Sequence, residues 1–213
     1  MRIRRRGAVV ASLTIAATIV AGTAHADSSD PIAFTNQRLV SYTGVQATNV
    51  FEPAIKVGPD GTIYTAANYH DKLTGVRGVE LWSAPFGTAL SSNGVIPPAR
   101  GGQDVDIAVG SKGNLYDGTT YLQSLNNGTG SYGVGVGACP AGSIPTNMSS
   151  CYGQQKVDAS HTDRPWIAAD GPSTVYLSYH DGSQSGQIDV AKSTDAGHTW
   201  SSVAEAVSPQ LRN

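Results

Sequence analysis

Short stretches of alternating apolar and polar residues follow one another along the chain, separated by turns rich in Gly, Pro, Asn, Asp and Ser. Residues 187–191 (Gln-Ile-Asp-Val-Ala) show the pattern, which suits a strand with one buried face. The 3.6-residue periodicity of helices is hard to find. The pattern therefore predicts an all-β fold.

One unit of this pattern occurs three times, as residues 55–64, 107–116 and 167–176. Each copy is an apolar strand, a turn that contains glycine, and a second strand that reaches an apolar residue followed by Tyr. The second copy begins 52 residues after the first, and the third begins 60 residues after the second. A period near 50 residues with several strands per repeat is typical of β-propeller blades. We expect about three four-stranded blades, at about residues 50–100, 101–160 and 161–210.

The strands inside these blades are not equally clear. Inner strands are expected at about 54–58, 104–110 and 166–169, and second strands at about 62–69, 114–122 and 174–179. Outer strands are expected at 79–83, toward Val95, at 187–191 and at 201–207. In the second blade, the sequence does not place the strands of the Gly-rich run 126–137 or of the cysteine-containing segment after it.

Three blades are fewer than the roughly four to eight that close a propeller. The sequence therefore suggests the N-terminal portion of a longer propeller, or a truncated gene product. A small complete β-sandwich built from the same strands is the alternative. The repeat favours the propeller.

The first 26 residues resemble a secretory signal peptide. They combine four arginines between residues 2 and 6, an uncharged apolar run over 7–22, and an Ala-x-Ala site that ends at Ala26. The run is too short for a membrane anchor. We expect cleavage near Ala26, a secreted domain over residues 27–213, and no membrane span.

Charge narrows the choice of partner. The formal net charge of −2 becomes −6 when the four arginines of the signal peptide are removed. Such a surface does not favour nucleic acid or an anionic membrane. A carbohydrate or an extracellular protein is the expected ligand, and no cofactor is expected.

The chain contains two cysteines, Cys139 and Cys151. In an exported protein an even number of cysteines favours a disulfide, which here would staple a short surface loop. Two free thiols or a metal pair are the alternatives. No His or Cys stands at the spacing of a zinc site, so the disulfide is favoured and no metal is expected.

Residues 193–200 read Ser-Thr-Asp-Ala-Gly-His-Thr-Trp. The carboxylate of Asp195 is able to accept hydrogen bonds from nearby backbone N–H groups, and Gly197 tolerates a positive φ. The Ser-x-Asp-x-Gly-x-Thr-Trp pattern resembles the Asp-box (BNR repeat) of the sialidase superfamily. The resemblance rests on Ser193, Asp195, Gly197, Thr199 and Trp200. It implies a sialidase-like β-propeller with this turn between the third and fourth strands of a blade. An ordinary hairpin turn is also compatible.

Charged residues recur just before the repeated apolar strands. Glu52, Asp104 and Arg164 stand three residues before the aligned isoleucines, with Asp106 and Asp163 beside them. Because inner strands begin around the axis of a propeller, we expect these five residues to ring its mouth as ligand-binding candidates. The alternative is plain turn chemistry, since Glu52 and Arg164 each precede a proline.

The resemblance also extends to the segments Glu-Pro-Ala-Ile at 52–55 and Asp-Arg-Pro-Trp at 163–166, which are similar to bacterial members. The family implies removal of terminal sialic acid with retention, by three arginines, an acid/base Asp and a Tyr nucleophile helped by a Glu. This chain lacks the Arg-Ile-Pro motif of the family, and only Arg164 stands at an inner-strand start. The aligned tyrosines Tyr64, Tyr116 and Tyr176 are expected to pack a repeated core position, and the catalytic residues stay unknown.

Three hypotheses about function remain. The favoured one is a module that binds glycans or proteins and lacks complete catalytic machinery. The second is an exo-α-sialidase-type glycoside hydrolase completed by downstream blades. The third is a truncated remnant without function. Whether the chain is an enzyme stays open.

Overall fold

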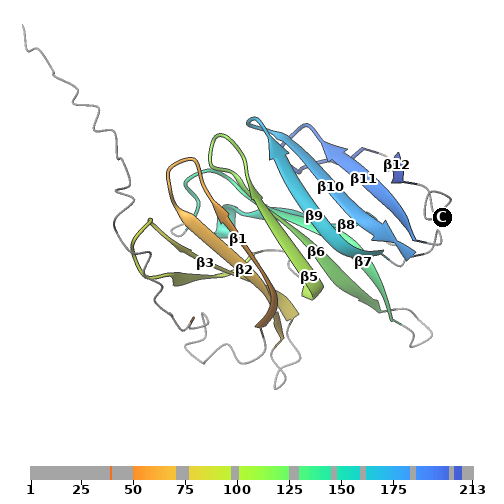
Figure 1. The fold of residues 1–213 in the computed structure, drawn as a ribbon, viewed down its shortest axis with the longest axis horizontal. Helices are drawn as coiled ribbons and strands as arrows, with labels where there is room; N and C mark the ends of the chain where they lie inside the picture. Colours follow the sequence, from red (N-terminus) through yellow and green to blue (C-terminus); the bar gives the residue numbers. More distant parts are fainter. Residues whose placement is uncertain are drawn as a thin grey trace, which may run out of the picture. The chain divides into compact units, whose positions relative to one another are not determined.

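Strands dominate the computed structural model (Figure 1). It describes residues 39, 50–70, 77–96, 101–124, 130–144, 148–158, 162–182, 186–201 and 204–207. The expected signal peptide lies outside these residues and stays a prediction. Within the described ranges, no helix is long and apolar enough to span a membrane.

Three four-stranded antiparallel sheets make up the described fold. The first contains β1 (Val50–Val57), β2 (Ile63–His70), β3 (Arg77–Ala84) and β4 (Ser91–Val95). The second contains β5 (Gly101–Val109), β6 (Leu115–Ser124), β7 (Gly130–Cys139) and β8 (Tyr152–Asp158), with a short 3-10 helix, Met148–Ser150, before β8. The third contains β9 (Thr162–Asp170), β10 (Thr174–Asp181), β11 (Gln187–Ser193) and β12 (Ala204–Val207).

Each sheet keeps its strands in chain order, and its first strand contacts the first strand of the neighbouring sheet. β5 lies between β1 and β9 and contacts both. Figure 1 shows the three sheets side by side with these strands next to one another. This is the arrangement of propeller blades, so the predicted all-β propeller fold with three four-stranded blades is confirmed.

Two apolar cores join the sheets. In the first core, between the first and second sheets, Leu81 packs with Ile107 and Leu115. In the second core, between the second and third sheets, Tyr116 packs with Leu177. Full burial of one such side chain stabilises the fold by about 1.5–3 kcal/mol.

The repeated positions show how the blades stack. The aligned isoleucines face the preceding sheet, so Ile107 and Ile167 are buried, whereas Ile55 of β1 is 64% exposed. The aligned tyrosines face the following sheet, so Tyr64 and Tyr116 are buried in the two cores. The shared core position predicted for the tyrosines holds for these two. Tyr176 is only half-buried, because it lies on the face of β10 opposite to the core.

Residues 130–137 of the Gly-rich run belong to β7, a strand that the sequence pattern did not place. In β7 the buried residues Val134, Val136 and Ala138 form one apolar face. Glycines stand between them, so the expected contrast of apolar and polar residues is absent. Such a strand escapes propensity rules, since glycine is depleted in strands.

Candidate functional site

The three inner strands begin with irregular pairing. The pairing register shifts between Phe51 and Ala54 in β1, between Gly101 and Val105 in β5, and opposite Ser178–His180 in β9. A β-bulge of this kind changes the direction of a side chain. These irregularities extend the inner strands back beyond the starts expected from the sequence.

Two bulge residues have a strained backbone. Glu52 has φ 51° and Arg164 has φ 49°, although neither is glycine. A left-handed conformation costs a residue with a Cβ roughly 1–2 kcal/mol. Both residues precede a proline, which has no N–H to pair in the ladder. A residue with positive φ followed by proline thus occurs at the start of the inner strand in both the first and the third blade, and in each case its charged side chain is exposed.

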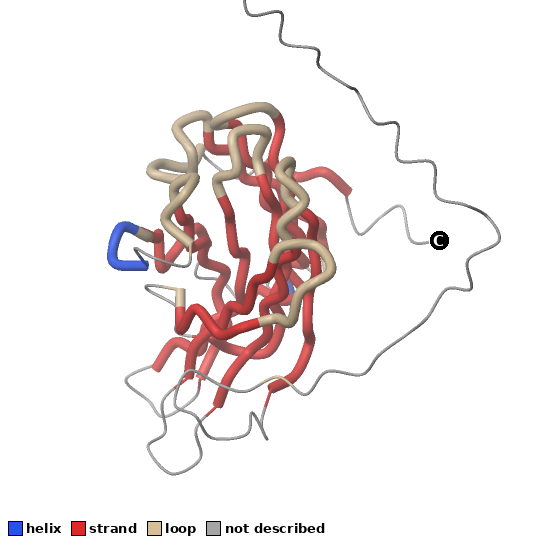
Figure 2. The backbone as a smooth tube through the Cα atoms, turned by 90° about the vertical axis from the view of Figure 1, so that its left-hand side faces the viewer, coloured by secondary structure: helices blue, strands red, loops and turns tan. Residues whose placement is uncertain are grey.

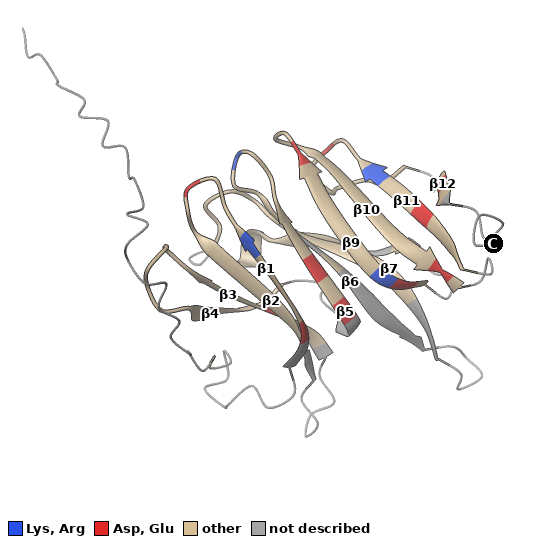
Figure 3. Cartoon of the chain, in the orientation of Figure 1, with Lys and Arg blue, Asp and Glu red and all other residues tan. Residues whose placement is uncertain are grey.

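A pocket of about 240 Å³ lies where these strand starts meet. It is lined by Glu52, Pro53, Ala54, Ile55 and Lys56 of β1, Asp104, Val105 and Asp106 of β5, and Arg164, Pro165 and Trp166 of β9. Figure 3 shows charged positions of both signs on these three strands. The pocket therefore combines residues from three blades.

Four of the five candidate residues, Glu52, Asp104, Asp106 and Arg164, line this pocket. The fifth, Asp163, forms a side-chain hydrogen bond with Asp104. Sequence reasoning missed two lining residues that carry chemistry.

One of these is Lys56, which lies on the same face of β1 as Ala54. The other is Trp166, whose side chain is 51% exposed. Lys56 and Trp166 follow the candidates Glu52 and Arg164 closely on the same strands. The alternation of side-chain direction along each strand was therefore the signal that could have identified them.

The surroundings of Asp104 favour its protonated form. Burial, the hydrogen bond and charge of Asp163, and the charge of Glu52 raise its pKa to about 6, although Arg164 opposes the shift. Two carboxyl groups that share a hydrogen bond hold a proton between them. The pocket therefore contains an acid that titrates in the mildly acidic range.

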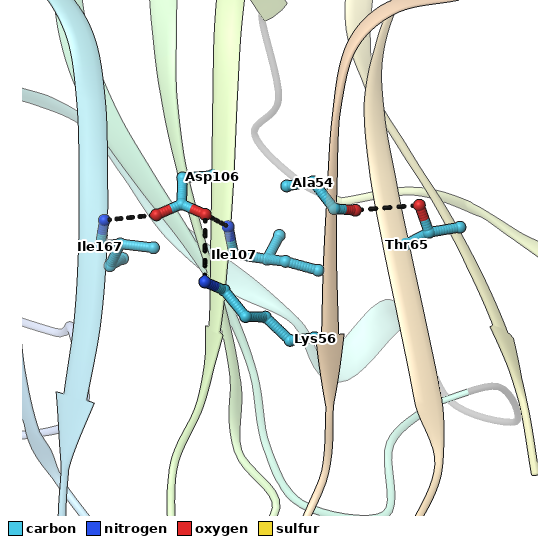
Figure 4. A network of polar contacts seen from close by, with 6 residues as sticks. All are labelled: Ala54, Lys56, Thr65, Asp106, Ile107 and Ile167. Carbon is cyan, nitrogen blue, oxygen red and sulfur yellow. Dashed lines mark hydrogen bonds and ion pairs between the residues drawn. The ribbon is translucent and has the colours of Figure 1, made fainter. Parts of the chain in front are cut away.

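Asp106 ties the inner strands together (Figure 4). Its Oδ1 accepts a hydrogen bond from the backbone N–H of Ile107 at 2.9 Å and lies 3.6 Å from Lys56 Nζ. Its Oδ2 accepts a hydrogen bond from the N–H of Ile167 in the third blade at 3.1 Å. One carboxylate thus joins three blades, which is a structural role beside any role in binding.

The Asp-box segment forms the turn between β11 and β12. Asp195 accepts hydrogen bonds from the Thr199 hydroxyl at 2.6 Å, the Thr199 N–H at 2.9 Å and the Ser193 hydroxyl at 2.7 Å. These bonds lower the pKa of Asp195 to about 2. Gly197, with φ 89°, donates its N–H to Ser193 Oγ at 2.8 Å, and Trp200 packs against the second core.

The corresponding turn of the second blade is closed covalently. The predicted disulfide between Cys139 and Cys151 is confirmed, and it joins the end of β7 to the start of β8. Both cysteines are buried in the first core, so the staple is anchored in the interior, beneath the surface loop it was expected to hold.

These turns lie away from the pocket. β9 and β11 both run from the pocket end of the third blade toward the opposite end, where the Asp-box follows. Figure 2 shows most of the described turns together at one end of the strands. Inter-blade bonds join them there, such as Asn114 Nδ2 to the Pro172 carbonyl at 3.1 Å and the Tyr152 hydroxyl to the Ala196 carbonyl at 2.7 Å.

Among the described residues, no three His, Cys, Asp or Glu side chains are placed to hold an ion. The described lining of the pocket offers carboxyl groups, two cations and an indole.

The sequence matches no family model and no curated protein. Solved structures resemble the fold. An alpha-L-arabinanase of Penicillium chrysogenum, solved with arabinobiose, has a TM-score of 0.55 and 13% identity over 84% of this chain and 55% of its own. A GH93 alpha-L-arabinofuranosidase of Fusarium graminearum, also with arabinobiose, has a TM-score of 0.53 and 15% identity over 81% of this chain and 53% of its own.

A second structure from Fusarium graminearum, the alpha-L-arabinofuranosidase Arb93A with an iminosugar inhibitor, has a TM-score of 0.52 and 15% identity, with coverage of 81% and 53%. The chain thus spans about half the length of these neighbours. At this identity the likeness concerns the fold, which is that of a β-propeller.

Proposed function

We propose that the chain is a saccharide-binding propeller module and that its binding site is the pocket between the starts of β1, β5 and β9. The observation that carries this proposal is the exposed indole of Trp166 beside the charged side chains of the pocket. An exposed, flat apolar surface next to hydrogen-bonding groups is what a sugar ring needs from a protein.

The groups of the pocket match those of a sugar. A pyranose or furanose presents C–H groups, which suit the negative face of an indole ring. Its hydroxyl groups donate to carboxylates such as that of Glu52 and accept from the guanidinium of Arg164. At about 240 Å³ the pocket is smaller than the sites of drug-sized ligands, which favours one sugar residue at a time.

The fold neighbours support the choice of ligand class. Two of them were solved with arabinobiose bound. Identity of 13–15% carries no residue of those sites to this chain. Arabinobiose is therefore a sensible first probe rather than an assigned ligand.

Titration calorimetry of the chain with arabinobiose, galactobiose and lactose tests the proposal. Wild-type protein is expected to bind at least one of them, and Trp166→Ala is expected to weaken that binding at least tenfold with an unchanged melting temperature. Phe86→Ala is the matched control, because Phe86 is also an exposed aromatic (81%) but lies in the turn after β3. Equal binding by wild type and Trp166→Ala would remove Trp166 from the site.

Glycoside hydrolysis is the second candidate function. Asp104, with its pKa raised to about 6, has the property that a general acid requires. Arg164 is the one arginine among the described pocket residues, whereas a sialidase needs three. Incubation with fluorogenic arabinosides and sialosides, with Asp104→Asn as the inactive reference, distinguishes a hydrolase from a binding module.

We further infer from the sequence that the chain is a sialidase-type Asp-box propeller exported after cleavage near Ala26, with blades at about 50–100, 101–160 and 161–210. N-terminal sequencing of the protein from a culture medium tests the export. A mature protein that begins near Asp27 is the expected result, and retention of Met1 would contradict it.

A further inference from the structure

This inference rests on the proposed function. We propose that the carboxyl pair of Asp104 and Asp163 makes the pocket select neutral saccharides over acidic ones, and that this preference becomes stronger as the pair loses its proton. Asp104 and Asp163 are thereby specificity-determining residues, and no bond of the ligand is broken.

The charges around the pocket are unbalanced. β1 supplies Glu52 and Lys56, β5 supplies Asp104 and Asp106, and β9 supplies Asp163 and Arg164. Among the described residues, four carboxylates face two cations, which leaves these six groups with a net charge of −2 when all are ionised.

The two cations, Lys56 and Arg164, compensate different carboxylates. Lys56 lies 3.6 Å from Asp106, and the oxygens of Asp106 also accept two backbone N–H groups. The charge of Asp106 is therefore compensated within the fold. Of the two described cations, Arg164 is the one whose charge acts on Asp104, against the charges of Asp163 and Glu52.

The hydrogen bond between Asp104 and Asp163 requires a proton, because two ionised carboxylates are both acceptors. With that proton present, the six groups carry a net charge of −1. The pKa of Asp104, raised to about 6 by burial and by Asp163, places the loss of the proton between mildly acidic and neutral pH. Above this pH the pocket is more negative by one charge.

A ligand carboxylate is repelled by this arrangement. It is able to pair with Arg164, but it must approach the carboxylates of Glu52 and Asp163 to do so. One additional charge at about 5 Å in a wet site changes the affinity for an anion by roughly fivefold to tenfold. A neutral sugar carries hydroxyl groups that donate to a carboxylate and accept from a carboxylic acid, so its affinity depends little on the proton.

Matched saccharide pairs test the inference. The probes are galactobiose with digalacturonic acid, and lactose with 3′-sialyllactose, titrated into the full chain at pH 5 and pH 7.5. In each pair the neutral member is expected to bind at least fivefold more tightly at pH 5. This ratio is expected to rise by a further fivefold to tenfold at pH 7.5.

Variants assign the effect to the pair. Asp104→Asn keeps the shape of the carboxyl group and removes its titration, so the ratio is expected to keep its pH 5 value at both pH values. Asp163→Asn is the second variant, and its amide oxygen still accepts the N–H of Arg164, which lies 3.0 Å away in the wild type. Glu205→Gln, an exposed acid on β12 at the far edge of the same sheet, is the control and is expected to behave as wild type.

The outcomes separate two failures. If no saccharide binds wild-type protein at either pH, the proposed function fails and this inference fails with it. If saccharides bind and the acidic member of each pair binds as tightly as the neutral one, or the ratio in Asp104→Asn still changes with pH, the proposed function survives and this inference is overturned.

Discussion

The side chains of Asp104 and Asp163 are hydrogen-bonded to each other, although they belong to the inner strands of two different blades. Neither carboxyl group is placed by its own strand alone. Both strands have a register shift near these residues, and the contact joins one blade to the next. It joins the stability of the blade interface to the protonation of the pocket.

Removal of the Asp104 charge is expected to stabilise the protein above pH 6. The folded pKa of about 6 lies above the unfolded value near 3.8, so the folded state binds the proton more tightly. This contribution is fully present below the unfolded pKa and is lost as pH rises through 6. Asp104→Asn keeps this stabilisation at all pH values, because the amide stays uncharged. With solvent screening, we expect a gain on the order of 1 kcal/mol at pH 7.5.

Thermal melts between pH 4 and pH 8 measure this effect. Wild-type protein is expected to lose stability relative to Asp104→Asn as pH rises, and the two curves are expected to converge near pH 4. Parallel curves over the whole range would show that Asp104 is not a titrating member of the pair.

The Asp106 carboxylate is expected to contribute more to stability than its ion pair does. Asp106→Ala leaves the N–H groups of Ile107 and Ile167 without their acceptor, which costs about 1–3 kcal/mol for a group away from water. Lys56→Met removes only an ion pair of a half-exposed lysine, worth about 0–1 kcal/mol. Urea denaturation of both variants measures the two losses. A larger loss in Lys56→Met would contradict the structural role assigned to the hydrogen bonds of Asp106.

The repeat predicts the fold well because its apolar positions have the same surroundings in successive blades. Ile107 and Ile167 are buried by neighbouring sheets, as the aligned pattern requires. Ile55 has the same sequence surroundings and is exposed. No local pattern distinguishes it from the other two, because burial here depends on which sheet lies opposite.

The candidate site is predicted less completely than the fold. Counting back from the aligned isoleucines identifies Glu52, Asp104 and Arg164, since equivalent positions of a repeat lie at equivalent places. It does not show that the carboxylate of Asp106 accepts hydrogen bonds from backbone N–H groups, or that the side chain of Trp166 is exposed. Those features depend on the distance between blades, which the periodicity of a single strand does not contain.

Loss of the Asp195 carboxylate is expected to loosen the Asp-box turn in a pH-dependent way. Its pKa is lowered to about 2, chiefly by the hydroxyl and N–H of Thr199. The stabilisation is therefore present above the unfolded pKa near 3.8 and is lost as pH falls through 2. Asp195→Asn is expected to melt below wild type at pH 7 and to approach it near pH 2.

Asp170→Asn is the control for this series, because Asp170 is an exposed acid at the end of β9, in the same blade and at the same end of the strands as the Asp-box. It is expected to melt as wild type throughout. If Asp195→Asn and Asp170→Asn behave alike at pH 7, the hydrogen bonds of the Asp-box do not stabilise the turn.

The disulfide is expected to stabilise the turn between the third and fourth strands of the second blade, as the Asp-box does in the third blade. It closes a loop with a sequence separation of 12, and a loop of this length corresponds to a stabilisation of about 3 kcal/mol through the unfolded state. The double variant Cys139→Ala/Cys151→Ala is expected to lower the free energy of unfolding by about that amount. Both cysteines are buried in the first core, so lost packing adds to the effect.

Equilibrium urea denaturation separates these two causes. Reduced wild-type protein keeps the packing of the cysteines but loses the constraint, so it is expected to lie between oxidised wild type and the double variant. A reduced wild type as stable as the oxidised form would show that the turn is held by packing alone. In that case the parallel between the disulfide and the Asp-box would hold for their position in the blade, and not for their contribution to stability.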